Sequence, residues 1–189
     1  MDTAFVFDLD GTLVDSVYQH VLAWREALET EGIDLSVWRI HRKIGMSGGL
    51  FTNMLLRETQ VEIDPARVER LQRLHAEAYK RNRAGVRPLP GATALLNTLS
   101  NAQIPWAIAT SGRLETAAPV LEKLGVDLSR TPVITRDQVK FAKPEPDLFI
   151  AAAARLDVRI ETAWVIGDSV WDTQAPGRGR WTSIVSDAH

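Results

Sequence analysis

The chain has 189 residues, of which 45% are hydrophobic and 24% are charged, as in ordinary globular proteins. It contains no cysteine, which excludes disulfides, thiolate metal sites and a cysteine nucleophile. The net charge of −2 argues against nucleic acid or an anionic membrane as the main partner. No apolar run could span a bilayer, and a strand is expected close to Met1, so we expect a cytoplasmic protein without a signal peptide or membrane partner.

The first predicted strand, Ala4 to Phe7, is followed directly by two acids, Asp8 and Asp10. Residues two apart in an extended segment point to the same side, so the two carboxylates are expected close together. Like charges at that distance are costly unless a cation or a proton lies between them. Gly11 allows the sharp turn that follows. An ordinary Asp-Gly loop would explain the turn, but not an acid that ends a buried strand.

Residues 17–85 are predicted to be almost entirely helical, because apolar residues recur there at three- and four-residue spacing. Four helices are expected: 17–31, 36–44, 50–59 and 64–79. Ser16 is the expected N-cap of the first, and Pro65 lies in the first turn of the last. A glycine-rich break at 45–49 separates the second from the third, and the Pro- and Gly-rich segment 83–91 is predicted as a linker.

Strands and helices alternate in the rest of the chain. Strands are expected at 106–109, 132–135, 163–166 and 183–185, and helices at 92–99, 114–124, 146–156 and from 170 to 175. Repeated βα units predict an α/β, Rossmann-like parallel sheet with helices on both faces. We therefore expect a discontinuous core of residues 1–15 and 86–189, with an inserted all-helical domain over 16–85.

Polar clusters follow three of the predicted strands, where open α/β sheets place their ligands. Asp8 and Asp10 form the first cluster, 110–112 (Thr-Ser-Gly) the second, and Asp168-Ser169 with Asp172 the third; Lys143 lies in a loop before a helix. Carboxylates without histidines suit Mg²⁺. A hydroxyl, a lysine and free backbone amides suit a phosphate. A carboxylate can act as nucleophile in phosphoryl transfer, with a second carboxylate as general acid and base.

Each cluster alone has an ordinary explanation. Thr110 to Gly112 could be a turn and a helix cap, Asp168-Ser169 a helix N-cap, and Lys143 a solvated surface lysine. The carboxylate of Asp172 would interact favourably with a helix dipole in any protein. Their order along the chain and their shared position after apolar strands favour a common site.

These motifs resemble those of the haloacid dehalogenase superfamily, in its phosphatase branch. The matching segments, in order, are 8–16 (DLDGTLVDS), Thr110, Lys143 within 142–147 (AKPEPD), and 167–172 (GDSVWD). The resemblance implies the following roles: Asp8 as nucleophile, Asp10 as general acid/base with its backbone carbonyl on Mg²⁺, Thr110 and Lys143 as phosphoryl ligands, and Asp168 and Asp172 at the metal. Asp8, Asp10, Asp168 and Asp172 are thus the expected metal residues.

The helical block 16–85 resembles the small α-helical cap of this family, which closes over the site and selects the leaving group. The resemblance places substrate contacts at Arg42, Lys43 and Ser47, in the loop segment 42–49 that joins two cap helices, although a plain helix–helix connection would fit this segment equally well. Ser111 and Gly112 are the expected substrate contacts of the core. Arg113 is a further candidate, an exposed arginine at a helix start being the alternative.

The resemblance implies an Mg²⁺-dependent hydrolase of phosphomonoesters, acting on a small metabolite such as a sugar phosphate or phosphoglycolate through an aspartyl-phosphate. A phosphomutase is the nearest alternative; Gly48-Gly49 offer no side chain for its second phosphate, but Arg42 and Lys43 are close in sequence.

Three other readings are weaker. A dehalogenase has no use for Asp10, and a phosphonate hydrolase would need Lys43 as its Schiff-base lysine. A non-catalytic binding domain is favoured only by residues 174–181, where Pro176 and two glycines oppose the helix that related chains continue.

Overall fold

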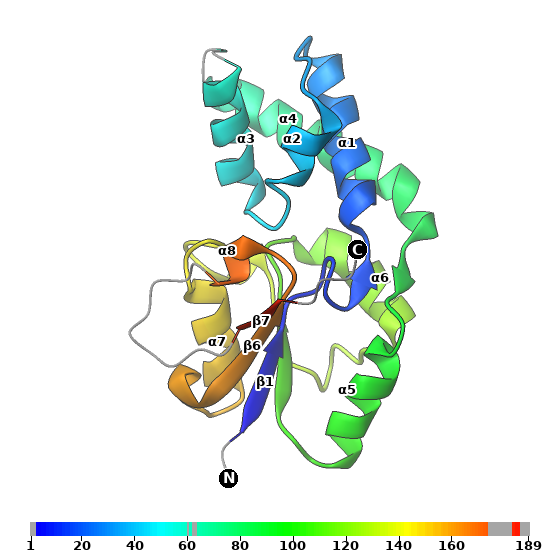
Figure 1. The fold of residues 1–189 in the computed structure, drawn as a ribbon, viewed down its shortest axis with the longest axis vertical. Coiled ribbons are helices and arrows are strands. Elements are labelled where there is room, and N and C mark those ends of the chain that lie inside the picture. The colour runs from blue at the N-terminus through cyan, green and yellow to red at the C-terminus, as the bar shows by residue number, and fades with distance from the viewer. Residues whose placement is uncertain (1–2, 60, 62–63, 174–182, 186–189) are drawn as a thin grey trace.

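A parallel sheet forms the centre of the larger part of the molecule (Figure 1). The structure is a computed structural model, and it describes residues 3–59, 61, 64–173 and 183–185. The strands are β1 (Ala4–Phe7), β4 (Trp106–Ala109), β5 (Val133–Ile134), β6 (Ala163–Gly167) and β7 (Ser183–Val185). They lie in the order β5-β4-β1-β6-β7, and every neighbouring pair is parallel. The predicted parallel sheet and its strands are confirmed, with β1 at the centre.

Helices cover both faces of this sheet, as the βα repeats predict. Because side chains alternate along a strand, Ala4 and Val6 of β1 pack in the cluster that contains α7 (Asp147–Arg155). Phe7 packs in the opposite cluster, with α5 (Ala92–Asn101) and α6 (Leu114–Leu124). The sheet is therefore buried on both sides, which explains why its strands are short continuous apolar runs.

Four further helices form the smaller part of the molecule, above the carboxyl ends of the strands in Figure 1. They are α1 (Val17–Thr30), α2 (Val37–His41), α3 (Gly48–Glu58) and α4 (Pro65–Asn82). They share a hydrophobic cluster of their own, which includes Trp24, Phe51, Leu55 and Leu71. Asp64 caps α4 by accepting a hydrogen bond from the Ala66 N–H at 3.0 Å, and Pro65 opens the helix as expected.

The two chain segments that connect these parts pair with each other. β2 (Val14–Asp15) and β3 (Arg87–Pro88) form an antiparallel ribbon, and a 3-10 turn, η1 (Arg83–Gly85), precedes β3. The interpretation of 83–91 as a plain linker is incomplete. Two-residue strands are too short to show an alternating pattern, and Pro88 at an edge position masks the signal.

Three shorter helices complete the described chain: η2 (Arg136–Gln138), η3 (Ile160–Thr162) and α8 (Val170–Thr173). The helix predicted over 170–175 is thus described to residue 173. The expected break at 174–181 lies outside the described residues. Within the described part, no helix combines the length and the apolar character needed to cross a membrane.

Candidate active site

The predicted clusters meet at the carboxyl ends of the three central strands. Asp8 follows β1, Thr110 follows β4, and Asp168 follows β6 after Gly167, the last residue of that strand. β4 and β6 are the two neighbours of β1 in the sheet, so the topology alone brings these side chains together. Lys143 reaches the same place from the loop before α7 and hydrogen-bonds Asp8.

Lys143 lies buried between two carboxylates. Its ammonium group donates to Asp8 and lies 2.6 Å from Asp172 Oδ1, and each of these three residues is at most 2% exposed. One carboxylate oxygen from each of Asp8, Asp168 and Asp172 falls within 4.8 Å of the other two. A single lysine is therefore surrounded by three acids, and the excess negative charge favours a bound cation.

The pKa values of these acids reflect the same excess of negative charge. Burial raises the pKa of Asp8 well above its usual value, the nearby Lys143 lowers it, and Asp172 and Asp168 raise it further. Burial, followed by the charge of Asp172, raises the pKa of Asp168 to about 6. The donor set consists only of carboxylate oxygens, which suits a hard divalent cation, so these residues fit the expected metal.

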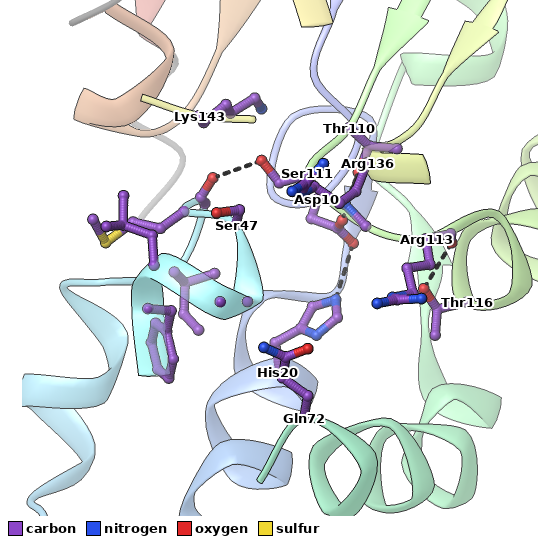
Figure 2. A pocket seen from close by; sticks show the side chains of 18 of the residues that line it. Asp10, His20, Ser47, Gln72, Thr110, Ser111, Arg113, Thr116, Arg136 and Lys143 are labelled. Carbon is purple, nitrogen blue, oxygen red and sulfur yellow. Dashed lines mark hydrogen bonds and ion pairs between the residues drawn. The ribbon is translucent and has the colours of Figure 1, made fainter. Parts of the chain in front are cut away.

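The carboxylate of Asp10 is turned to other partners. It accepts a hydrogen bond from Ser16 Oγ at 2.6 Å. It also accepts one from the His20 imidazole, whose Nε2 lies at 3.3 Å (Figure 2). Thr110 Oγ1 lies 3.4 Å from its other oxygen. Of the four residues expected at the metal, the structure therefore groups three by their side chains. The resemblance assigned the backbone carbonyl of Asp10 to the metal, and that assignment stays a prediction.

These contacts also set the pKa of Asp10. Burial would raise this pKa, but the charge and hydrogen bond of His20 and the hydrogen bond of Ser16 outweigh burial and lower it to about 2. Ser16 stands at the N-cap position of α1, yet its side chain makes no capping hydrogen bond. The prediction that Ser16 caps α1 is wrong in this respect, because its hydroxyl donates to Asp10 instead.

His20 belongs to an aromatic stack between α1 and α4. Its ring lies 3.9 Å from that of Tyr79 at an interplanar angle of 5°, and its Nδ1 lies 3.2 Å from Nε2 of His75. The His75 ring in turn lies 4.1 Å from Trp24. Burial, and then the charge of His20, lowers the pKa of His75 well below its usual value, so His75 is neutral. The stack fixes the ring that holds Asp10.

Between the sheet edge and the helices above it lies a cavity of about 470 Å³, which both parts of the chain line. Of the predicted substrate contacts, four line it: Lys43, Ser47, Ser111 and Gly112. Arg42 does not line it. Its exposed guanidinium lies 5.5 Å from the centroid of the Trp38 ring, and the prediction that it contacts substrate gains no support. Arg113, the further candidate, also lines the cavity.

The loop that carries Ser47 rests on the core. Ser111 Oγ donates to the Gly45 carbonyl at 3.2 Å, and the Ser47 N–H donates to the Lys143 carbonyl at 3.3 Å. Gly45 has φ +97°, and a Cβ there would lie 2.6 Å from Ser169 Oγ. Both the conformation and the close approach therefore require glycine at this position.

Among the polar residues that line this cavity, sequence reasoning did not assign His20, Gln72, His75, Thr116, Arg136 and Asp137. His20 and His75 occupy positions in helical apolar stripes, which predicts core packing. One sequence signal could have identified His20. It lies four residues after Ser16, so the two side chains share one face of α1, and this helix starts shortly after Asp8 and Asp10 in the chain. Gln72 and Arg136 carry no comparable sequence signal.

Comparisons with known proteins agree with this geometry. A family model described as haloacid dehalogenase-like hydrolase matches residues 3–178. The chain therefore belongs to the haloacid dehalogenase-like hydrolases, and the expected family, fold class and enzyme type are confirmed.

Hexitol phosphatase A of Escherichia coli (strain K12) is 34% identical over 167 residues, which cover 87% of this chain and 74% of that protein. Beta-phosphoglucomutase of Bacillus subtilis (strain 168) is 29% identical over 160 residues, which cover 82% of this chain and 70% of that protein. The crystal structure of a hydrolase from Pseudomonas syringae is 50% identical with a TM-score of 0.93, covering 97% of this chain and 84% of that one.

Proposed function

We propose that this enzyme hydrolyses phosphate monoesters of a small hydroxylated metabolite of the sugar-phosphate type, through an aspartyl-phosphate on Asp8. The observation that carries the proposal is the pair of acids with separate surroundings. Asp8 is buried beside Lys143 within the acid cluster, whereas Asp10 is held by Ser16 and His20. Two neighbouring carboxylates with different surroundings suit a nucleophile and a proton carrier.

In the first step, a carboxylate oxygen of Asp8 attacks phosphorus and the ester P–O bond breaks. Asp10 donates a proton to the departing alkoxide. In the second step, water attacks phosphorus, Asp10 accepts its proton, and phosphate leaves with the Asp8 carboxylate restored. The low pKa of Asp10 keeps it ionised in the free enzyme, which is the form that can accept a proton. The negative charge of a bound phosphoryl group raises this pKa, which lets the same group carry the proton it donates.

Lys143 and Thr110 are the proposed phosphoryl ligands, and Asp8, Asp168 and Asp172 the proposed side-chain holders of Mg²⁺. A bound Mg²⁺ supplies neutralising charge for the phosphoryl oxygens. We propose that helices α1–α4, within residues 16–85, act as a cap that excludes water, as their contacts with the core through Gly45 and Ser47 support. The proposed partner is thus a small phosphorylated metabolite.

One observation favours a phosphomutase as the second candidate. Arg136 lines the cavity, and its side chain donates to the Val139 carbonyl at 2.7 Å while no carboxylate of the described residues pairs with it. It could therefore hold a second phosphate. The relative named beta-phosphoglucomutase agrees with this alternative.

The test is hydrolysis of a generic aryl phosphate with Mg²⁺ and then with EDTA. We expect turnover that EDTA abolishes, and a loss of at least about a thousandfold in Asp8→Asn, because the covalent route disappears. Turnover that EDTA does not change, and that is equal in Asp8→Asn and the parent, would contradict the proposal. A mutase would instead convert a sugar phosphate to its isomer with little release of phosphate.

A further inference from the structure

The wall that the cap helices contribute to the cavity carries little free charge. The ammonium group of Lys43 lies 2.5 Å from Glu58 Oε1, so this cation is already neutralised. Arg42 lies over Trp38, outside the cavity lining. His75 is neutral. Among the described residues, what the cap offers a ligand far from the phosphoryl site is mainly neutral polar groups, and the side-chain amide of Gln72 is one of them.

Gln72 is placed to use its amide on a ligand. It lies on α4, one helical turn before His75, which contacts the ring that holds Asp10. Figure 2 shows its side chain rising from α4 into the cavity. The amide makes no hydrogen bond to any described residue, and the side chain is only partly exposed. A polar group of this kind, at a cavity wall and without a protein partner, is available to substrate.

Gly49 leaves this amide uncovered, and Gly48 lies beside the same side chain. They form the first turn of α3, where a Cβ on Gly49 would lie 3.5 Å from Gln72 Nε2, and one on Gly48 4.0 Å from Gln72 Cγ. Neither glycine has a positive φ, so the backbone does not require glycine at either position. Glycine weakens a helix by up to about 1 kcal/mol relative to alanine. A Cβ alone would make only van der Waals contact at these positions, whereas a longer side chain at Gly49 would extend over the Gln72 amide.

A primary amide offers two N–H donors and one carbonyl acceptor, and it has no charge. A hydroxyl group both donates and accepts, so it can satisfy both sides of the amide. A phosphate or carboxylate only accepts, so it could use the N–H donors but would leave the amide carbonyl without a hydrogen-bond donor. The chemistry of Gln72 therefore matches the hydroxyl groups of a neutral polyol or sugar.

We propose that Gln72 determines specificity by hydrogen-bonding a hydroxyl group of the leaving group, which selects monophosphates of neutral polyols and sugars over bisphosphates and phosphorylated acids. This inference rests on the proposed phosphatase function. It assigns to Gln72 no part in the chemical step. Loss of the Gln72 amide should thus lower kcat/KM more for substrates that carry hydroxyl groups than for substrates that do not.

The experiment compares kcat/KM for a hexitol phosphate with kcat/KM for an aryl phosphate that has no hydroxyl groups. In Gln72→Leu we expect the ratio of the two values to fall about tenfold, mainly because the KM for the hexitol phosphate rises. This change is equal to, or somewhat larger than, the effect of losing one neutral hydrogen bond. In Gln72→Lys we expect the preference to move toward a hexose bisphosphate. Glu77→Gln, on the exposed face of the same helix, should leave the ratio unchanged.

Gly49→Leu provides an independent test, because its side chain would cover the amide while strengthening the helix. We expect it to lower the same ratio as Gln72→Leu without lowering the melting temperature. An unchanged ratio in either variant, or a parent enzyme that prefers bisphosphates or phosphorylated acids, would overturn the inference. Failure of the parent to hydrolyse the aryl phosphate would instead overturn the proposed function, so the two failures are distinguishable.

Discussion

At the scale of single residues, the environment of Asp10 is the most informative feature of the site. Its neighbours in sequence do not determine its chemistry. Ser16 and His20 do, and both come from the start of α1 rather than from the sheet. The cap helix therefore contributes to the protonation state of a residue that belongs to the core.

His20→Ala tests this arrangement. We expect kcat for an aryl phosphate to fall about tenfold to a hundredfold, because Asp10 loses the partner that orients it. The pKa of Asp10 should also rise, since the charge and hydrogen bond of His20 lower it now. The limb of the pH profile that reports the ionisation of Asp10 should thus move to higher pH. Leu22→Ala on the exposed face of α1 is the control; a pH profile of His20→Ala that is unchanged in both limbs would contradict the account.

Asp168 predicts a pH dependence of stability in the chelated protein. Its pKa is raised to about 6 in the folded state, so the proton binds more tightly there than in the unfolded chain. The stability that this group contributes is full below about pH 4 and is lost as pH rises through about 6. In Asp168→Asn the side chain cannot ionise, so stability is not lost as the pH rises. In EDTA at about pH 7 we expect this variant to be more stable than the parent by up to about 3 kcal/mol.

Urea denaturation of both proteins near about pH 3 and near about pH 7 measures this effect. The difference in free energy of unfolding should vanish near about pH 3, where Asp168 is mostly protonated in both folded and unfolded chains. Equal destabilisation by Asp168→Asn at both pH values would show that the carboxyl group acts by packing and not by its charge.

At the scale of elements, the segment between α2 and α3 connects the cap to the core. Gly45→Ala should break this contact, because the Cβ would meet Ser169 and the φ of +97° strains an alanine. We expect kcat/KM to fall at least about tenfold, since the loop that carries Ser47 can no longer rest on Lys143. Gly32→Ala is a matched control: its φ is +73°, and nothing lies within 4 Å of its Cβ position.

Both glycine variants should lose roughly 1 kcal/mol or more of stability from the backbone conformation. Only Gly45→Ala should lose activity. Thermal unfolding and steady-state kinetics on the two variants separate these effects, and equal activity in the two would show that the loop contact has no part in function.

The elements also show what sequence reasoning can reach. Buried parallel strands have a strong local signal, so β1, β4 and β6 were predictable, and the acids that follow them converge because neighbouring strands share an edge. The pairing of β2 with β3 was not predictable, because each strand has two residues and 71 residues separate Asp15 from Arg87. The contacts of Asp10 with His20, and the access of Gln72 to the cavity, depend on how the cap helices sit over the sheet, and no local pattern encodes that.

At the scale of the whole molecule, the cap and the core meet on both sides of the cavity. His20 holds Asp10 on one side, and the loop at Gly45 and Ser47 contacts Ser111 and Lys143 on the other. Trp171, from α8 of the core, packs against the hydrophobic cluster of the cap helices. A single arrangement thus brings together the acid cluster, the proton carrier and the wall that would contact the leaving group.

The most direct test of the central claim is to locate the phosphoryl group during turnover. In Asp10→Asn the base for the second step is missing, so the intermediate should accumulate after an aryl phosphate is added, whose leaving group needs no proton from Asp10 in the first step. Acid quenching and peptide mass analysis should find one phosphoryl group on Asp8, and none in Asp8→Asn. Release of phosphate by the parent with no phosphorylated Asp8 in either protein, or a phosphoryl group on another residue, would contradict the account.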